Sequence, residues 1–373
     1  MIYLDYSANT PVDEAVLQRF CEMERRFTGN PNSLHPAGLD ARNELAHVTA
    51  SIASLLNVAE TEIIYTSGAS ESNNTAIKGI CRSSRHLGKH IISTPLEHAS
   101  VSGCLTALQN QGYEIDLVRV GRNGKIDLDD LHRLLRRDTV LVTVCAVDSE
   151  LGTVQPVREI VEILKDFPDC RLHVDATQAI GKIAFPFDGI DTASFAPHKF
   201  YGLNGSGILF KRKNLTIEPL IHGGASTTIY RSGTPTLALD AAMETALRLA
   251  TENMETHNTI VKKHNETLRS ALSCYPKVHI NSPEDAVPHI LNLSIKGIKG
   301  TTFQKALSEK GVCVSVKSAC STDGTPSRAV FAVSRDRRNA LSSLRISLSH
   351  LTTSAEIKHF LHMFECSYKR LTE

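Results

Sequence analysis

Short apolar runs alternate with longer segments of helical periodicity through most of this chain. The runs typical of strands are 62–65, 90–92, 114–118, 140–144, 171–174 and 207–210, and the helical segments include 38–56, 100–111 and 127–137. Such alternation is typical of units in which a helical crossover joins two parallel strands. We therefore expect an α/β fold with a mainly parallel sheet and helices on both of its faces.

A second, smaller unit is expected toward the end of the chain. Segment 236–271 has the periodicity of one or two long helices, and strand-like runs follow at 290–294, 312–316 and 344–347. A last helix is predicted at 354–368, where Thr353 and Glu356 form a capping-box pattern. We expect a large domain over 14–255 and a small α+β domain made of 1–13 and 256–373.

The charge balance excludes partners selected by bulk electrostatics. The 373 residues include 41 Lys plus Arg and 40 Asp plus Glu, a net charge of +1, which gives no long-range attraction to nucleic acid or anionic membranes. No run approaches the ~18 apolar residues that span a bilayer. Asp5 interrupts the start of the chain where a signal peptide needs an apolar core. We expect a cytoplasmic protein that binds neither membrane nor nucleic acid directly.

Nine cysteines are spread along the chain, and no two of them form a Cys-x-x-Cys pair. The odd number argues against a disulfide framework, and the spacing argues against a zinc site of local ligands, so no metal is expected. Most of the thiols, such as Cys145 between Val144 and Ala146, fit core positions. Cys320 differs because it lies in the polar segment 318–325, where a thiol can be exposed as a nucleophile requires.

Asp175 and Lys199 together indicate a particular chemistry. Asp175 ends a strand-like run, and Lys199 lies in the turn-like segment 196–202. Pyridoxal phosphate requires a carboxylate that keeps its ring nitrogen protonated and an amine that forms a Schiff base. Each residue alone has an ordinary explanation, as a turn-forming aspartate or a surface lysine. The glycine-rich segment 202–207 leads into a strand instead of opening a helix, which excludes a dinucleotide-binding motif.

Two further segments could contact such a cofactor. Residues 66–73 join a strand to a helix, where backbone amides and the Ser70 hydroxyl can hold a phosphate. An ordinary helix cap would explain the same pattern. His98 follows the next strand-like run, and it could either lay its ring against a cofactor plane or have a structural role.

Taken together, these residues resemble the cysteine desulfurase family, pyridoxal-phosphate enzymes of fold type I within the class-V aminotransferases. The resemblance covers essentially the whole chain. It rests on ordered matches at 3–8, 29–33, 66–74, 97–98, 174–178, 198–202, 231–234, 318–320 and 344–347. It implies a large domain with a mainly parallel sheet of the seven-stranded type.

The resemblance also implies a cofactor, pyridoxal 5'-phosphate, and the residues that hold it. Lys199 would form the Schiff base, Asp175 would pair with the pyridinium nitrogen, His98 would stack on the ring, and Gln178 would approach the phenolic oxygen. The implied contacts to the phosphate come from Ala69, Ser70 and His198, and from Thr234 of the other subunit in a homodimer.

The implied reaction is the removal of sulfur from L-cysteine. Arg345 would bind the substrate carboxylate. Cys320 would take the sulfur as a persulfide and leave L-alanine. The segment after Cys320 resembles that of long-loop members, which pass sulfur to an acceptor protein. The sulfur would serve iron–sulfur cluster assembly or the thiolation of tRNA or a cofactor.

Three positions depart from the family pattern. Ser149 stands where the family usually has an asparagine near the cofactor oxygen and the substrate, and Ala196 replaces a serine that contacts the phosphate. Residues 225–230 replace a Gln-Glu-Arg-Gly segment. These changes leave two alternatives open: a lyase acting on selenocysteine or a cysteine derivative, and a non-catalytic paralogue that binds or regulates a partner.

Overall fold

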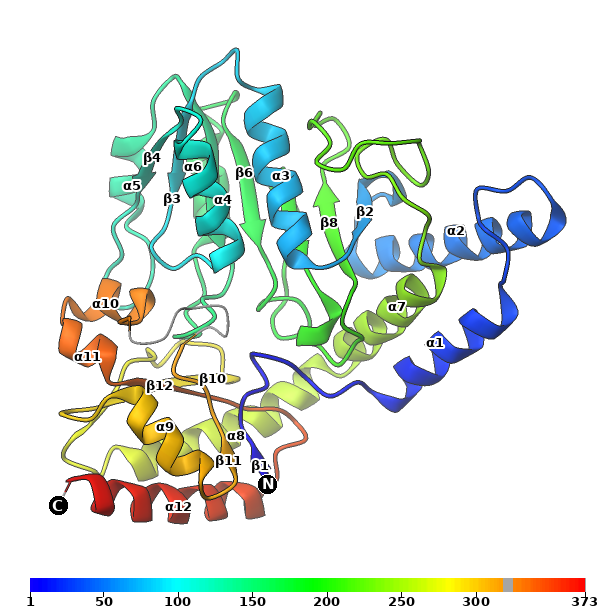
Figure 1. Ribbon diagram of the computed structural model, residues 1–373. Helices are drawn as coiled ribbons and strands as arrows, with labels where there is room; N and C mark the ends of the chain where they lie inside the picture. Colours follow the sequence, from blue (N-terminus) through cyan, green and yellow to red (C-terminus); the bar gives the residue numbers. More distant parts are fainter. Residues whose placement is uncertain (318–324, 373) are drawn as a thin grey trace.

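The alternating apolar runs form one central sheet. In the computed structural model, which describes residues 1–317 and 325–372, this sheet has seven strands in the spatial order β2-β8-β7-β6-β5-β3-β4 (Figure 1). Neighbouring strands are parallel except in the two pairs that involve β8. The strands are β2 (Ile63–Thr66), β3 (His90–Ser93), β4 (Glu114–Leu117), β5 (Thr139–Cys145), β6 (Arg171–Asp175), β7 (Thr192–Phe195) and β8 (Gly207–Lys211). The predicted α/β class with a mainly parallel sheet is confirmed.

Strand β7 was not predicted from the sequence, because half of its side chains are polar. All four residues are nevertheless buried in the sheet. The Thr192 hydroxyl lies 2.9 Å from His173 Nδ1, and the Ser194 hydroxyl donates to Asn73 Oδ1. Hydrogen bonds to other buried polar groups thus replace the apolar contacts from which a strand is predicted.

Helices cover both faces of the sheet, as predicted. Helices α3 and α4 share one apolar core with Ile64, Ile91 and Leu209, whereas α2, α5, α6 and α7 pack on the opposite face and α1 packs against α7. Their bounds are α1 (Glu14–Arg26), α2 (Pro36–Leu56), α3 (Ala69–Ser83), α4 (Ala99–Gln109), α5 (Leu128–Leu134), α6 (Val157–Leu164) and α7 (Leu237–Glu252). None of the helices in the described part of the chain is long and apolar enough to cross a bilayer.

The smaller unit combines both ends of the described chain. Strand β1 (Ile2–Tyr3) pairs in parallel with β11 (Val312–Cys313), and a second, antiparallel sheet has the order β12-β10-β9. Ile2 and Leu4 share its apolar core with residues from Val261 to Tyr368. The other elements are α8 (Met254–Leu272), β9 (Val278–Ile280), β10 (Ile290–Ile295), α9 (Gly300–Ser308), α10 (Arg328–Ser334), α11 (Arg337–Leu341), β12 (Ser343–Ser347) and α12 (Ser354–Thr372).

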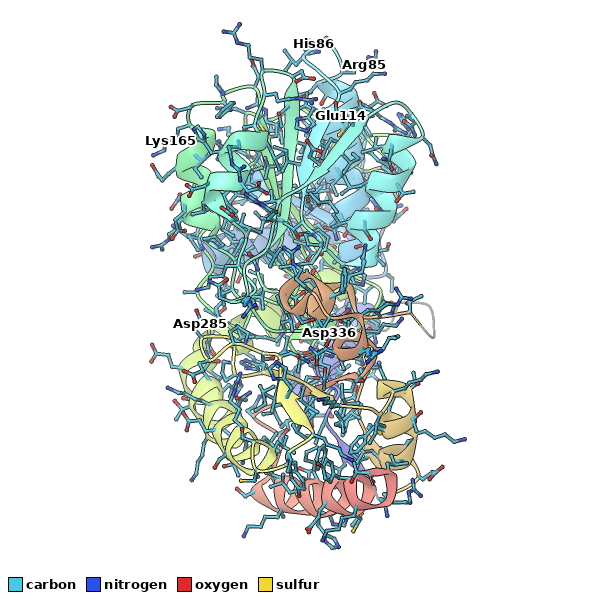
Figure 2. The ribbon with its side chains drawn as sticks, turned by 90° about the vertical axis from the view of Figure 1, so that its left-hand side faces the viewer. Arg85, His86, Glu114, Lys165, Asp285 and Asp336 are labelled. Carbon is cyan, nitrogen blue, oxygen red and sulfur yellow. The ribbon has the colours of Figure 1, made fainter. Side chains whose placement is uncertain are left out.

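Figure 2 shows the two units one above the other, with charged side chains such as Glu114, Lys165 and Asp285 at the surface. The separate apolar cores support the predicted division into 14–255 and 1–13 with 256–373, which stays a prediction.

Three elements predicted toward the end of the chain are present in the structure, and one of them has a different length. The long helical segment at 236–271 forms two helices that meet at Asn253. The strand predicted at 312–316 is wrong in length, because regular pairing ends at Cys313 and continues only as an isolated bridge between Ser315 and Arg345. The capping box is confirmed, since the Glu356 amide donates to Thr353 Oγ1 at 3.2 Å and the Thr353 amide donates to the Glu356 carboxylate at 2.8 Å.

Candidate active site

A cavity of about 360 Å³ lies where the carboxyl ends of the parallel strands face the smaller unit. Clefts at this edge are the usual ligand sites of open α/β sheets. The cavity brings together nine of the residues predicted from the sequence, namely Ala69, Ser70, His98, Ser149, Asp175, Gln178, His198, Lys199 and Arg345. Thr234 is exposed and does not line the cavity. Cys320 lies outside the described residues.

Lys199 ends a 3₁₀ turn over Pro197–Lys199 between β7 and β8. Its Nζ donates to the carbonyl oxygens of Ser7 at 3.0 Å and Ala8 at 2.7 Å, both from the first segment of the chain. The amine therefore lies at the junction of the two units. Lys199 supplies the amine that a Schiff base requires, whereas Arg345, the other cation in the cavity lining, carries a guanidinium.

Asp175 is the last residue of β6, and its carboxylate is buried at the cavity wall. Its Oδ2 accepts a hydrogen bond from Asn73 Nδ2 at 2.9 Å, and its Oδ1 accepts one from the Thr177 amide at 3.0 Å. Both carboxylate oxygens are thus held in place by hydrogen-bond donors. The site therefore presents an oriented carboxylate that can pair with a protonated ring nitrogen.

Asn73 is a site residue that the sequence analysis missed. It is fully buried on α3, and its Oδ1 accepts hydrogen bonds from His173 Nε2 at 2.9 Å and from the Ser194 hydroxyl. Burial lowers the pKa of His173 to about 4, so the ring is neutral at physiological pH. These two donors orient the Asn73 amide so that its NH₂ group points to Asp175. The signal in the sequence was its place in the matched segment 66–74, about one helical turn after Ser70.

Two glycines allow β8 to approach the start of α3. Gly68 precedes the helix with a φ of +152°, a conformation that residues with a Cβ rarely adopt. At Gly207, the first residue of β8, an added Cβ would lie 2.6 Å from Gly68 Cα. Because the first amides of α3 have no helical partner, this helix start can bind an anion at Ala69 and Ser70.

We expect Gly207→Ala to distort this helix start. The new methyl group must displace backbone atoms, so the free energy of unfolding should fall by about 1 to 3 kcal/mol and the affinity for a phosphate-bearing cofactor should fall with it. Denaturant unfolding and cofactor titration measure the two effects. Gly103→Ala on α4 is the matched control, since nothing lies within 4 Å of its added Cβ. Equal effects of the two substitutions would contradict this account of Gly207.

His98 precedes α4 and caps it. Its Nδ1 accepts a hydrogen bond from the Ser100 amide at 3.2 Å, so the neutral ring carries its proton on Nε2. Burial lowers the pKa of His98, although the charge of Asp175 opposes this. A flat, neutral imidazole thus forms part of the cavity wall.

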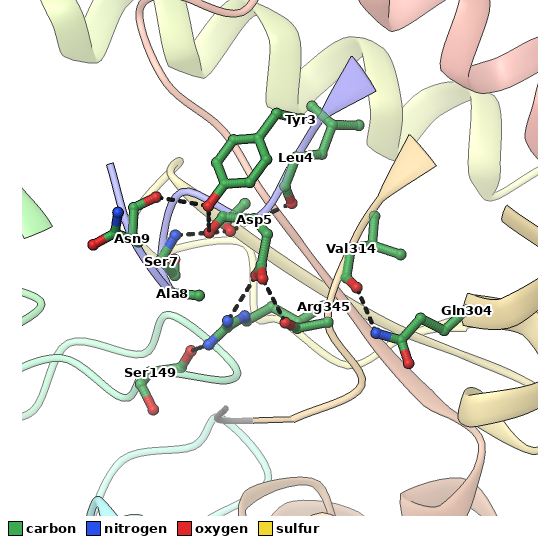
Figure 3. Close-up of polar contacts among 12 residues, drawn as sticks. Tyr3, Leu4, Asp5, Ser7, Ala8, Asn9, Ser149, Gln304, Val314 and Arg345 are labelled. Atoms are coloured by element: carbon green, nitrogen blue, oxygen red, sulfur yellow. Dashed lines mark hydrogen bonds and ion pairs between the residues drawn. The ribbon is translucent and has the colours of Figure 1, made fainter. Parts of the chain in front are cut away.

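Arg345 reaches the cavity from β12 of the smaller unit (Figure 3). One of its terminal nitrogens donates to the carbonyl oxygen of Ser149 at 2.8 Å, and the other donates to the Asp5 carboxylate at 2.9 Å. Its Nε is buried without a hydrogen-bond partner among the described residues. Since a guanidinium has five N–H donors, this side chain retains donors for an anion in the cavity.

The comparisons with known proteins agree with this geometry. A family model described as aminotransferase class-V matches residues 2–360. The chain belongs to the class-V aminotransferase family. A NifS/IcsS protein homolog of Lactobacillus delbrueckii subsp. bulgaricus is 37% identical over 379 residues, covering 100% of this chain and 98% of that protein. A cysteine desulfurase IscS of Dictyoglomus turgidum is 34% identical over 375 residues, covering 99% and 95%.

Solved structures give the same result for this class-V aminotransferase. A structure named "NIFS-LIKE PROTEIN" superposes with a TM-score of 0.92 at 34% identity, covering 100% of this chain and 99% of that chain. The family resemblance inferred from the motifs is therefore confirmed.

Pyridoxal 5'-phosphate is the cofactor of this family, and the cavity fits it. The fit rests on the donor set: a lysine amine, a buried carboxylate with fixed hydrogen bonds, and a helix start that can bind an anion. In addition, the Thr177 hydroxyl at the cavity wall is buried without a partner among the described residues. An occupant with a polar group would satisfy it.

Proposed function

We propose that this protein is a cysteine desulfurase, which removes sulfur from L-cysteine and releases L-alanine. The observation that supports this most is the arrangement of Lys199, Asp175 and Arg345 around a single cavity. This set provides an amine, a carboxylate for the cofactor ring and a cation for an amino-acid carboxylate. Relatives at 34% to 37% identity that bear desulfurase or NifS/IcsS names support the same reaction.

The cofactor, when bound, supplies a ring that withdraws electrons from the substrate Cα. In the proposed arrangement, Asp175 holds the proton on the ring nitrogen, and His98 stacks on the ring. Lys199 Nζ moves the proton at the substrate Cα. The remaining contacts are proposed for Ala69, Ser70 and His198 at the phosphate and for Gln178 and Ser149 near the phenolic oxygen.

Cys320 is the proposed acceptor of sulfur. Its thiolate attacks the sulfur of the substrate, so that an S–S bond forms and the bond from Cβ to sulfur breaks. The electron pair of that bond stays with the carbon skeleton, which gains protons and leaves as alanine. The Ser-Ala-Cys motif at 318–320 supports this role. We further propose that the persulfide passes to an acceptor protein for iron–sulfur cluster assembly or for thiolation of tRNA or a cofactor.

The decisive experiment combines two measurements on the wild-type holoprotein. It is incubated with L-cysteine, first without reductant to detect a single added sulfur by mass spectrometry, and then with reductant to measure turnover. We expect alanine and sulfide in equal amounts. Pyruvate and ammonia, or turnover only with selenocysteine, would favour a lyase. A protein that binds cofactor but forms no product would favour a non-catalytic role.

Arg345 is the proposed site of the substrate carboxylate, and Arg345→Ala tests it. A charge-assisted, bidentate contact contributes about 1.5 to 3 kcal/mol. Its loss should therefore lower kcat/KM for L-cysteine by roughly ten- to a hundredfold or more. Steady-state kinetics with L-cysteine measure this effect.

Asp5→Asn is the matched control for Arg345. It keeps the shape of the side chain but removes the charge that Arg345 Nη2 contacts at 2.9 Å. If Arg345 only stabilised the smaller unit through this ion pair, Asp5→Asn and Arg345→Ala would impair kinetics alike. We expect Asp5→Asn to be the milder change.

A homodimer is part of the proposal. Leu34 is 82% exposed and Ile229 is 70% exposed, on segments joined by a hydrogen bond of 3.0 Å between Asn32 and Ser226. Thr234, proposed to reach the phosphate of the other subunit, is exposed in the same loop region. Analytical ultracentrifugation tests this association, and a monomer would contradict it. We also propose a cytoplasmic location, supported by eight free thiols among the described cysteines.

A further inference from the structure

Lys182 is a buried lysine in the segment after β6, and its side chain is not part of the cavity lining. Its backbone is fixed from two sides. Gly181 takes a φ of +76°, and Asn258 Nδ2 on α8 donates to the carbonyl oxygen of Lys182 at 2.9 Å. Only 6% of the residue is exposed. Burying an amine is costly unless its donors are satisfied, so the position calls for a physical explanation.

The Lys182 amine is joined to Lys199 through a chain of hydrogen bonds. Lys182 Nζ donates to Gln178 Oε1 at 2.8 Å, and Gln178 Nε2 donates to the carbonyl oxygen of Ser7 at 3.0 Å. That carbonyl oxygen also accepts from Lys199 Nζ at 3.0 Å. Because an ammonium group only donates, Lys182 fixes the Gln178 oxygen on its own side. The NH₂ group of Gln178, which lines the cavity, is then the part that can meet an occupant.

The surroundings of Lys182 leave its positive charge uncompensated. A small cavity behind the active site is lined by Lys182 and Lys199 and by the rings of Tyr6, Tyr201, His257, His289 and His350; among the described residues that line it there is no carboxylate. The charge of Arg345 also acts on Lys182, and the charge of Lys182 in turn acts on His198. Burial, followed by the charges of Lys199 and Arg345, lowers the pKa of Lys182 to about 7. Burial likewise lowers the pKa of His289 to about 3, so that ring adds no charge at neutral pH.

We propose that Lys182 is a positioning residue for the cofactor. It turns the NH₂ group of Gln178 toward the phenolic oxygen and, in its protonated form, places a positive charge behind Lys199. Both effects favour loss of the proton that the Lys199 nitrogen shares with the bound cofactor. The first effect stabilises the negative oxygen, and the second disfavours a further positive charge. Lys182 acts through Gln178 and Lys199 and touches no reacting atom.

Two substitutions separate the hydrogen bond from the charge. Lys182→Met removes both, whereas Lys182→Gln keeps a donor for Gln178 Oε1 and removes only the charge. The readout is the pH midpoint of the visible absorbance of the bound cofactor, measured on the holoprotein without L-cysteine. We expect the midpoint to rise by about 0.5 to 1 pH unit in Lys182→Met and by less in Lys182→Gln. The measurement requires bound cofactor but no substrate, so its result is independent of whether the proposed reaction is correct.

Lys211→Met is the matched control. Lys211 is also buried, and its Nζ donates to backbone carbonyl oxygens, including that of Leu215 at 2.8 Å, away from the cavity lining. Its substitution should leave the midpoint unchanged. The proposal is overturned if Lys182→Met keeps the wild-type midpoint, or if Lys211→Met moves it equally. Loss of cofactor binding in Lys182→Gln would also overturn it, since that result would indicate a general structural role.

Discussion

The Lys199→Ala variant is expected to form no alanine from L-cysteine above the background of free cofactor. The substitution removes the amine proposed to bond to the cofactor, which is also the base proposed to move the Cα proton, and a positioned base alone contributes about 10²- to 10⁴-fold. Folding should survive, because the lost hydrogen bonds lead to the carbonyl oxygens of Ser7 and Ala8 at the cavity edge. Alanine analysis by chromatography measures the effect.

Two further variants make the Lys199 result specific. Lys199→Arg keeps a cation that can donate to Ser7 and Ala8 but cannot form the bond to the cofactor, so it should be as inactive as Lys199→Ala. Lys211→Ala, in the neighbouring strand β8, should remain active. Alanine production by Lys199→Ala at the wild-type rate would refute the role of this lysine.

Cys320→Ala should lose sulfide release and the added sulfur, yet keep the absorbance of the bound cofactor. The Cys320 thiolate is the proposed acceptor of sulfur, whereas the residues proposed to hold the cofactor lie elsewhere in the chain. Mass spectrometry of the peptide that contains residue 320, after brief exposure to L-cysteine, is the direct measurement.

Cys313→Ala is the matched control for Cys320. Cys313 lies in β11, seven residues earlier, and pairs with Tyr3 in the small sheet. It should keep sulfide release. A persulfide found on Cys313 or another thiol would refute the role of Cys320, and alanine formation that survives Cys320→Ala would move the function toward a lyase.

The sequence predicted those parts of the fold that follow from local patterns. Apolar runs indicated six of the strands in the large sheet, but β7 was missed because Thr192 and Ser194 satisfy their hydroxyls through partners on other elements. The strand at Val312–Cys313 is short for a similar reason, since its ladder partner among the described residues is the two-residue β1. Pairing between segments that are distant in the sequence cannot be predicted from a local run of residues.

The candidate site shows the same division. Motifs identified nine residues that the structure gathers around one cavity. They did not identify Asn73 or Lys182, whose importance arises only from contacts. Asn73 contacts Asp175 across 102 residues of sequence, and Lys182 is joined to Lys199 by hydrogen bonds through Gln178 and Ser7. The roles of this buried amide and this buried amine become visible only when the fold supplies their partners.

The pairing of β1 with β11 has a consequence for the newly synthesised chain. Asp5 leaves the ribosome early, but its partner Arg345 follows 340 residues later, which takes tens of seconds at about 5 to 20 residues per second. During that interval the large sheet can assemble while Leu4, fully buried in the finished protein, remains without its core. A ribosome-bound intermediate thus lacks both the cavity's guanidinium and the segment that contains Cys320. The cavity described here can therefore be completed only after Arg345 has been synthesised.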